Sequence, residues 1–402
     1  MASCPIDLEK WAEHYDFQDL AYIRDPYPVW SALREDCPVA HSDLNGGYWV
    51  PTRYEDIKRI AQDPVLFSSR DAHILMDDPD LPPITTDPPA HTRIRRILLP
   101  AFSPQAAARW EPATSLIAED LIDGFVAEEQ IDASYDYARQ LPLRIFSRLL
   151  GIKVQDGDRF HAWITRMEDA ANPEDQEAAF GEMGAYLHGT VLEHRDNPQD
   201  DLITTLIKVQ ADGESLSDRE LVTTCFLLVL AGFDTTWSAL SNTIHYLANH
   251  PEDRKRLVEA LDEPEPSLWP LAVEEFLRAF ANLSLVRRVT TEVKIEGRVF
   301  HENERVLLPF GAANHDPRVF KNPNNVQIDR TENRHLAFGA GIHRCLGSNL
   351  ARMEVRVGLQ TFLRRVPNFS IPEGGEVSFE GAHVRRAERL PLLIQPSIGS
   401  NR

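Results

Sequence analysis

A glycine-rich segment with a single cysteine, followed at once by a strongly patterned helix, constrains this chain more than any other feature. Residues 338–347 read Phe-Gly-Ala-Gly-Ile-His-Arg-Cys-Leu-Gly, which puts the cysteine at position 345. The next residues have the apolar spacing of a helix that ends before Pro367, with apolar positions Ala351, Val355, Leu359, Phe362 and Val366. Free backbone N–H groups and the positive end of a helix dipole favour a thiolate at Cys345, and a metal ligand or a nucleophile needs that form.

The glycines of this segment point to a flat ligand. Gly339, Gly341 and Gly347 have no Cβ, so the backbone can turn sharply and a bulky planar group can come within contact distance. A planar cofactor fits such a segment better than a peptide substrate does. For a lone cysteine, the alternative is a buried structural residue on a glycine-rich turn.

Composition disfavours several other classes of protein. The formal charge of −20 argues against nucleic acid and anionic membrane surfaces as partners, because a phosphate backbone selects for a basic face. The cysteines at 4, 37, 225 and 345 are far apart, which predicts neither a disulfide framework nor a zinc site. The longest apolar run, 225–233, is far shorter than the roughly 20 residues of a membrane span, and residues 1–25 do not resemble a signal peptide. We therefore expect a cytoplasmic protein without a membrane anchor.

Secondary-structure signals predict a mainly α chain with a minor β region, organised as one domain over residues 1–402. Ser103 is a good helix cap before Pro104, and helical patterns continue from about 103 to about 281. A second helical part is expected at about 346–366. Strand signals concentrate at about 30–70, 285–330 and 371–402, and short helices separated by proline breaks accompany them in the first hundred residues.

One helix of the middle region carries polar residues where a core is expected. It starts with a capping box, Ser217 and Glu220, and continues apolar on nearly every side, which is typical of a buried helix. Yet residues 231–236 read Ala-Gly-Phe-Asp-Thr-Thr. A glycine weakens a helix, and a buried acid and hydroxyls cost stability, so this placement indicates a site.

The ten residues around Cys345 resemble the haem-binding loop of the cytochrome P450 family, Phe-Gly-x-Gly-x-His-x-Cys-x-Gly, and every fixed position is met. The resemblance extends over the whole chain. It implies that iron protoporphyrin IX (haem b) lies between a long distal helix and the helix after the cysteine loop, with Cys345 as the iron ligand. It also implies that Phe338, Gly339 and Gly347 contact the cofactor.

Two further family motifs imply structural and cofactor-binding roles. Glu275 and Arg278 match the Glu-x-x-Arg pair, whose spacing puts both side chains on one helical face, where they can form an ion pair. In the family this pair joins an upstream arginine, here Arg330, and holds the proximal side rigid. The haem propionates need cations or donors nearby, and the resemblance assigns that role to His91, Arg95, Arg287 and His343.

The segment 231–236 resembles the family's distal-helix signature, Ala/Gly-Gly-x-Asp/Glu-Thr. The match implies that Ala231 and Gly232 border the cofactor, that Thr235 holds a water or donates to the distal oxygen, and that Asp234 connects that water to solvent. Activation of dioxygen needs electrons and protons, so a controlled proton route is expected here. The alternative, compatible with the first, is that Thr235 bonds back to the preceding helical turn beside Gly232.

The resemblance places an apolar substrate against the loop 70–86, the distal helix, the strand after the Glu-x-x-Arg helix and a turn near the C-terminus. The implied wall residues are Ile74, Leu75, Ile84, Leu227, Leu230, Leu283 and Val384. Such walls suit a terpenoid, a fatty-acid derivative, an aromatic compound or a polyketide intermediate, and leave these classes open.

Electrons must come from a separate protein, because the chain contains no flavin or iron–sulfur motif. By analogy with bacterial soluble relatives, we expect a ferredoxin with its reductase, and otherwise a monomer that meets only its small-molecule substrate and dioxygen. A basic cluster offers a local dock for an acidic partner, although a solvated face explains it equally well. Its members are Arg93, Arg96, Arg334, Arg344, Arg352 and Arg356.

The resemblance favours a monooxygenase, which hydroxylates or otherwise oxidises its substrate. A peroxygenase driven by hydrogen peroxide is a second hypothesis, and the intact pair of Asp234 and Thr235 argues against it because proton delivery serves the dioxygen route. A haem-binding sensor or carrier without turnover is a third, and the completeness of the motifs disfavours it.

Overall fold

The computed structural model describes residues 6–70, 74–75, 80–168, 172–211, 214–262, 267–280 and 283–395. Its helices are α1 (Leu8–Glu13), α2 (Leu20–Arg24), α3 (Tyr27–Asp36), α4 (Tyr54–Gln62), α5 (Ala90–Leu98), α6 (Pro104–Phe125), α7 (Gln140–Leu150), α8 (Gly157–Glu168), α9 (Pro173–Asp196), α10 (Leu202–Lys208), α11 (Asp218–Asn249), α12 (Pro251–Glu259), α13 (Trp269–Phe280), α14 (Phe310–Asn314) and α15 (Ser348–Arg365). Short 3-10 or π turns are η1 (Leu44–Gly46), η2 (Leu99–Phe102), η3 (Ser134–Ala138), η4 (Val154–Asp156), η5 (Ala260–Asp262) and η6 (Gly341–His343).

The strands are short and form small sheets. They are β1 (Val39–Ser42), β2 (Tyr48–Pro51), β3 (Phe67–Ser68), β4 (Gln130–Asp132), β5 (Gln210–Ala211), β6 (Glu214–Ser215), β7 (Ser284–Val289), β8 (Val293–Ile295), β9 (Arg298–Phe300), β10 (Arg305–Pro309), β11 (Asn368–Ser370), β12 (Ser378–Glu380), β13 (Arg386–Arg389) and β14 (Pro391–Gln395). The largest sheet has the order β1-β2-β10-β7-β3. Its pairs are antiparallel except β10 with β2, where Val306 lies opposite Trp49.

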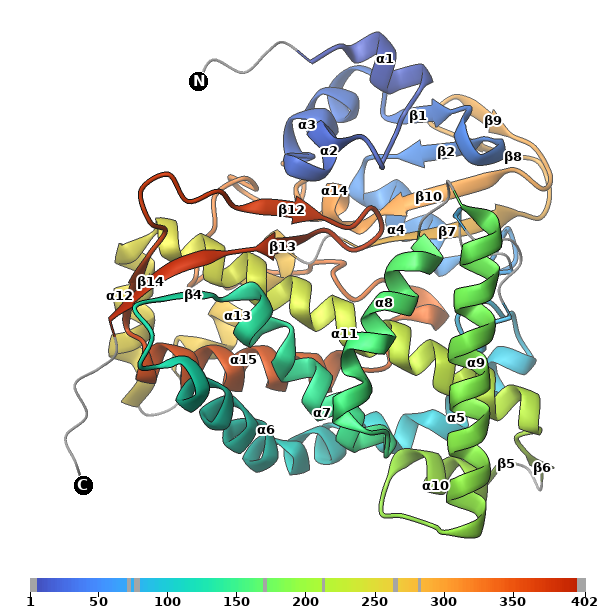
Figure 1. The fold of residues 1–402 in the computed structure, drawn as a ribbon. Coiled ribbons are helices and arrows are strands. Elements are labelled where there is room, and N and C mark those ends of the chain that lie inside the picture. Colours follow the sequence, from blue (N-terminus) through green and yellow to red (C-terminus); the bar gives the residue numbers. More distant parts are fainter. Residues whose placement is uncertain are drawn as a thin grey trace.

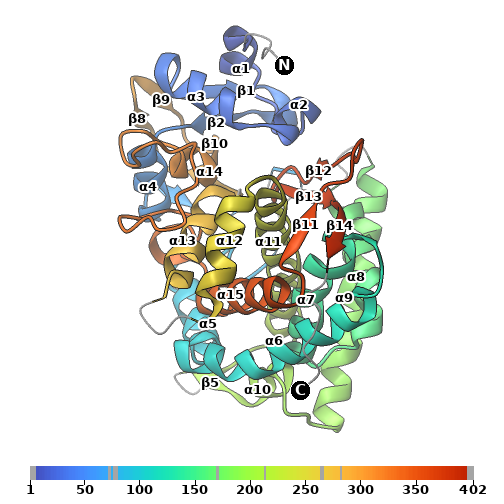
Figure 2. The same ribbon diagram turned by 90° about the vertical axis from the view of Figure 1, so that its left-hand side faces the viewer.

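The longest helices and the large sheet occupy different parts of the molecule (Figure 1). The N-terminal helices α1–α3 lie with β1 and β2 at one end, and the long helices α6, α9, α11 and α15 build the rest. In both views α11 runs through the interior and α15 crosses close to it, in agreement with their direct packing (Figure 2). This pair of helices frames the site described below.

Helix α11 is buried because almost every side of it is apolar. Ser217 caps it, and the predicted capping box with Glu220 is present. The helix packs against α7, α9, α13, α15 and β13. Among the described residues it is the one helix long and apolar enough to cross a membrane, yet 61% of its most apolar window is buried inside the fold. Its apolar character is therefore accounted for by the protein core.

The prediction of a mainly α fold with a minor β region is confirmed. Helix α6 begins at Pro104 with Ser103 as its cap, and α15 ends at Arg365, before Pro367. The part expected to be β-rich at 30–70 also holds α3 and α4, and the helical region 103–281 is interrupted by β4 and by the β5–β6 hairpin. Residues 281 and 396–402, at the ends of two predicted regions, lie outside the described residues.

Candidate active site

A large cavity lies between α11 and the start of α15. It contains about 1400 Å³ of space that no protein atom fills, part of it open to solvent. Helix α11 lines one wall, and the segment 337–347 with the first turns of α15 lines another. Cys345 is exposed to this cavity. The cysteine loop and the polar segment of α11 therefore meet around one space, as the sequence predicted.

The loop around Cys345 is fixed by its backbone. The Cys345 N–H donates to the Phe338 carbonyl at 2.8 Å. Gly339 and Gly341 have φ of +67° and +72°, a left-handed conformation that residues with a Cβ rarely adopt. At Gly341 a Cβ would also lie 2.5 Å from the carbonyl oxygen of Ala61 in α4. These two glycines are thus required by the turn itself and by α4.

Burial dominates the ionisation of the cysteine. Although Cys345 lines the cavity, the surrounding protein desolvates the sulfur and raises the pKa of its thiol. A hydrogen bond from the Gly347 backbone and the charges of Arg95, Arg344 and Arg352 act in the opposite direction without reversing the shift. The backbone at the start of α15 thus acts toward the thiolate as expected, but in the protein alone burial outweighs it. A bound metal cation is what would deprotonate this sulfur.

Buried histidine ring nitrogens without hydrogen-bond partners among the described residues gather at one edge of the cavity. The ring of His91 in α5 lies 4.4 Å from the ring of His343, which lines the cavity. Both ring nitrogens of His91 and Nε2 of His343 are buried with no hydrogen-bond partner in the described part of the chain. Burial lowers the pKa of His343 to about 2, so in the protein alone this ring is neutral.

Two arginines lie near the same edge. Arg287 of β7 is only 2% exposed, and burial lowers its pKa to about 10. Its guanidinium donates to the Val286 carbonyl at 2.7 Å, and no carboxylate among the described residues pairs with it. Arg95 lines the cavity and donates to the Arg344 carbonyl. The charge of Asp87 acts on Arg287 but does not reverse the lowering of its pKa by burial. A buried cation without an ion-pair partner is costly, so this edge is suited to an anionic group.

These features fit a haem. Buried polar atoms are normally hydrogen-bonded, and the unpaired ring nitrogens of His91 and His343, with a buried Arg287 whose charge only Asp87 offsets among the described residues, suit the carboxylates of a ligand. Gly347 lines the cavity, and a Cβ there would meet no atom within 4 Å. That open space beside Cys345 suits a flat macrocycle.

The distal helix presents Thr235 to the cavity, together with Ala231 and Gly232. The Thr235 hydroxyl donates to the Ala231 carbonyl at 2.8 Å, which is the back-bond that the sequence left open. Helix α11 continues through this point without a break. A Cβ at Gly232 would lie 2.4 Å from the ring of Phe146 in α7, so the glycine allows two helices to pack closely.

Asp234 lies behind the cavity wall. Thr235 lines the cavity, whereas Asp234 does not. Its side chain is buried, and its Oδ2 lies 3.9 Å from Nη1 of Arg386 in β13. Nε of Arg386 donates to Glu388 at 2.7 Å. Burial raises the pKa of Asp234, while the charge of Arg386 acts to lower it. The acid thus contacts the arginine of β13 and not the open cavity.

The Glu-x-x-Arg motif forms the predicted ion pair. Glu275 and Arg278 of α13 are completely buried, and Nε of Arg278 lies 2.8 Å from Oε2 of Glu275. Nε of Arg330 reaches the same oxygen at 2.8 Å. Asn333 and the Gln327 N–H also donate to this carboxylate. The network ties α13 to the segment that precedes the cysteine loop.

A buried acid was missed by the sequence reasoning. Glu354 of α15 lines the cavity and is 2% exposed, and its Oε1 has no hydrogen-bond partner among the described residues. Burial raises its pKa to about 8, with a smaller opposing effect from Thr236. An acid beside Val355, within the apolar stripe of the predicted helix, is the signal that could have revealed it.

The predicted substrate wall is partly in place. Ile84, Leu227, Leu283 and Val384 line the cavity. Three other predicted wall residues do not line the cavity. Ile74 and Leu75 are buried in the core near the large sheet, and Leu230 packs against the core around α7–α10. Apolar lining residues that the sequence did not indicate are Leu98, Phe102, Phe146, Leu228, Leu277 and Leu285. Residues 71–73 and 76–79 of the expected substrate loop lie outside the described residues.

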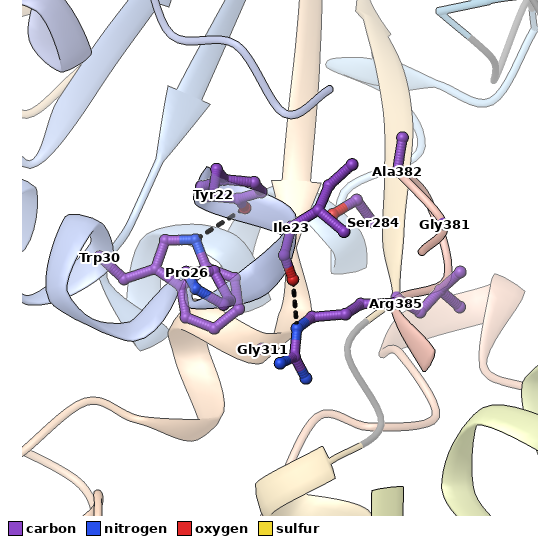
Figure 3. A pocket seen from close by; sticks show the side chains of 10 residues that line it. Tyr22, Ile23, Pro26, Trp30, Ser284, Gly311, Gly381, Ala382 and Arg385 are labelled. Carbon is purple, nitrogen blue, oxygen red and sulfur yellow. Dashed lines mark hydrogen bonds between the residues drawn. The ribbon is translucent and has the colours of Figure 1, made fainter. Parts of the chain in front are cut away.

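A smaller pocket lies where the N-terminal helices meet the turn before β13 (Figure 3). Leu283 lines both this pocket and the large cavity. Nε1 of Trp30 donates to the Tyr22 hydroxyl at 3.0 Å, and Nε of Arg385 donates to the Ile23 carbonyl at 2.6 Å. These polar groups satisfy one another, so the pocket is a junction between elements.

The arginines near Cys345 differ in their surroundings. Arg352, Arg356 and Arg93 form ion pairs with Glu274, Glu111 and Glu220 respectively. Arg334 and Arg344 are exposed, and neither side chain forms an ion pair with a described residue. Arg96 is exposed and interacts with other groups. The basic cluster expected from the sequence is thus neutralised in part.

Comparison with known proteins identifies relatives over almost the whole chain. A family model described as Cytochrome P450 matches residues 177–380. The vitamin D(3) 25-hydroxylase of Pseudonocardia autotrophica is 34% identical over 399 residues, which cover 96% of this chain and 97% of that protein. The mycinamicin IV hydroxylase/epoxidase of Micromonospora griseorubida is 34% identical, over 86% of this chain and 89% of that one.

Solved structures share the fold. The crystal structure of CYP109E1 from Bacillus megaterium in complex with testosterone superposes with a TM-score of 0.85, at 28% identity over 94% of this chain and 99% of that one. The cytochrome P450 PksS of the bacillaene polyketide synthase from Bacillus subtilis 168 gives a TM-score of 0.85 at 29% identity, with the same coverage.

Proposed function

This chain belongs to the cytochrome P450 family of monooxygenases, and we propose that it uses haem b, dioxygen and electrons from a separate protein to oxidise a small apolar molecule. The observation that carries the proposal is the cavity between α11 and α15. Cys345 and Thr235 both border it, and unpaired buried histidine nitrogens lie at its edge. We treat residues 1–402 as one catalytic domain.

The proposed cofactor contacts follow from the charges around the cavity. Cys345 binds the iron, while His91, Arg95, Arg287 and His343 donate to the propionates. The residues placed against the macrocycle are Ala231, Gly232, Phe338, Gly339 and Gly347. When bound, the haem would supply the redox chemistry, in which dioxygen, electrons and protons are consumed, one oxygen atom is inserted into the substrate and the other leaves as water.

The chain's own residues control protons in this proposal. The Thr235 hydroxyl now donates to the Ala231 carbonyl, and by rotating it can hold or donate to a water in the cavity. Asp234 takes up protons on the side of Arg386 and Glu388 and passes them to the water that Thr235 holds in the cavity. A raised pKa brings Asp234 closer to the range in which it can both accept and release a proton.

We propose an apolar substrate because the lining includes Ile84, Leu227, Leu283 and Val384. Relatives named for vitamin D(3) and mycinamicin IV, and a neighbour bound to testosterone, indicate which classes to screen first. A ferredoxin with its reductase is the proposed electron source, and the exposed cations of Arg334 and Arg344 are its proposed contacts. The proposed location is the cytoplasm, as a monomer.

The proposal is tested by substrate titration of the haem-loaded protein. A panel of a secosteroid, a steroid, a macrolide and a fatty acid is screened for the shift from low-spin to high-spin haem. Leu227→Phe narrows the cavity and should weaken the shift, whereas Leu230→Phe, on the same helix but not on the lining, should preserve it.

Turnover then separates the candidate activities. Product that requires NADH, ferredoxin, its reductase and dioxygen supports the monooxygenase. Equal turnover with hydrogen peroxide alone would identify a peroxygenase. A spin shift without product under either condition would identify a non-catalytic haem protein and contradict the proposal.

A further inference from the structure

Glu274 of α13 holds Arg352 of α15 in a fixed orientation. Nε of Arg352 donates to Oε1 of Glu274 at 2.5 Å, and Nη2 donates to Oε2 at 2.9 Å. Two parallel hydrogen bonds of this kind fix the plane of a guanidinium as well as its position. Burial acts to raise the pKa of Glu274, but the hydrogen bonds from Arg352 and His335 lower it to about 2. The carboxylate is therefore charged across the physiological range.

The fixed guanidinium lies over the first residue of the cysteine loop. Its Cζ is 4.4 Å from the centre of the Phe338 ring, within the range of a cation–π contact. The Phe338 carbonyl in turn accepts the hydrogen bond from the Cys345 N–H at 2.8 Å. A chain of direct contacts thus runs from Glu274 through Arg352 and Phe338 to the backbone of the cysteine.

His335 adds a second attachment between the same carboxylate and the loop. Its Nε2 lies 2.9 Å from Oε2 of Glu274, and its Nδ1 accepts from the Ala337 N–H at 3.2 Å. Because Nδ1 accepts a hydrogen bond, the neutral ring that carries its hydrogen on Nε2 satisfies both contacts. Glu274 therefore anchors the loop through Ala337, the residue that precedes it, and, independently, through Phe338.

We propose that Arg352 is a positioning residue for the iron ligand, held by Glu274 so that it fixes Phe338 and, through the Phe338 carbonyl, the backbone of Cys345. The inference rests on the proposed function, because it requires Cys345 to bind haem. It differs from the docking role that the sequence suggested for Arg352, since an internal carboxylate already accepts from two of its nitrogens, Nε and Nη2. Contacts that orient a metal ligand tune how firmly that ligand is held.

The test follows the thiolate-type absorption of the carbon monoxide complex of the reduced, haem-loaded protein over time. Arg352→Gln and Glu274→Gln should both lose this band several-fold faster than the parent, and the double variant no faster than either single one. Arg352→Lys should recover only part of the loss, because a lysine can neither form two parallel bonds nor lie flat on the ring.

Arg356→Gln is the matched control. Arg356 lies one turn further along α15 and forms an ion pair of 2.7 Å with Glu111, but it does not contact the cysteine loop. This variant loses a comparable ion pair and should keep the lifetime of the band. If Arg352 had a merely structural role, Arg352→Gln and Arg356→Gln would lose the band at the same rate.

The salt dependence of reduction by ferredoxin separates the positioning role from the docking hypothesis, under which Arg352→Gln would weaken that dependence. Under the positioning role, Arg352→Gln leaves the salt dependence of reduction by ferredoxin unchanged, whereas Arg344→Gln weakens it. The inference is overturned if the band of Arg352→Gln lasts as long as that of Arg356→Gln. A parent protein without the thiolate-type band would instead refute the proposed function itself.

Discussion

Replacing Glu275 by glutamine tests the buried ion-pair network most sharply. The carboxylate accepts five hydrogen bonds, of which Oε1 takes those from Arg278 Nη2 and the Gln327 N–H. Oε2 takes those from Arg278 Nε, Arg330 Nε and Asn333 Nδ2. Whichever oxygen becomes an amide NH₂, at least two buried donors then face another donor.

The expected loss is large because both charges of the pair are fully buried. Removing one partner of a buried ion pair costs about 3–5 kcal/mol, and this range already includes the unpaired donors. With an unfolding entropy of about 2.1 cal/mol/K per residue over 402 residues, the thermal midpoint should fall by about 4–6 °C. Since α13 is tied here to the segment before Cys345, haem release should also accelerate.

Urea unfolding and thermal melting of the haem-loaded protein measure this effect. Glu259→Gln is the control, because the Lys255–Glu259 pair of α12 has a separation of 3.7 Å and side chains that are 76% and 62% exposed. An exposed pair at this helical spacing is worth about 0.3–0.5 kcal/mol. If Glu275→Gln destabilises no more than the control, the network does not hold the proximal side together.

Three further variants probe the cavity. Thr235→Ala should keep the haem spectrum but release peroxide in place of product, measured as the ratio of product to NADH consumed; equal coupling in mutant and parent contradicts its proton role. For Glu354, the folded pKa of about 8 exceeds the ordinary 4.5, so the folded state holds its proton to higher pH and stability is lost as pH rises from 4.5 to 8. Glu354→Gln should lack that decline in urea titrations, and an identical pH profile would show that the acid is not buried. Gly232→Ala should lower the free energy of unfolding by about 1–3 kcal/mol, because the added Cβ collides with Phe146. Gly189→Ala is the control: its Cβ would meet no atom within 4 Å, so it should stabilise α9 by about 0.5–1 kcal/mol. Equal unfolding midpoints for the two variants would refute the packing argument.

The features that sequence predicted well depend on near neighbours. The capping box of Ser217 and Glu220 and the ion pair of Glu275 with Arg278 each span three residues, so helical spacing alone brings their side chains together. The position of Cys345 just before α15 is local in the same sense. These signals were sufficient for the starts of α6 and α11, for the end of α15 and for the elements that frame the cavity.

Contacts between distant elements were beyond such local reasoning, and the contact of Arg330 with Glu275 was predicted only through the family resemblance. Arg352 meets Glu274, 78 residues away, and nothing in the sequence distinguishes this arginine from the exposed Arg344. Asp234 and Thr235 are consecutive, yet only Thr235 reaches the cavity, because neighbouring helical residues point in different directions and the packing of α11 decides which one faces inward. Gly232 was predicted as a weak point of the helix, and only the structure reveals Phe146 as the reason for it.

The central claim, that the sulfur of Cys345 binds a haem iron in this cavity, is tested most directly by one absorption spectrum. The reduced protein with carbon monoxide should absorb near ~450 nm, the band associated with thiolate ligation. Cys345→Ser should lose that band, while Cys37→Ser should retain it. A parent without the band, or a Cys345→Ser variant that keeps it, would contradict the account.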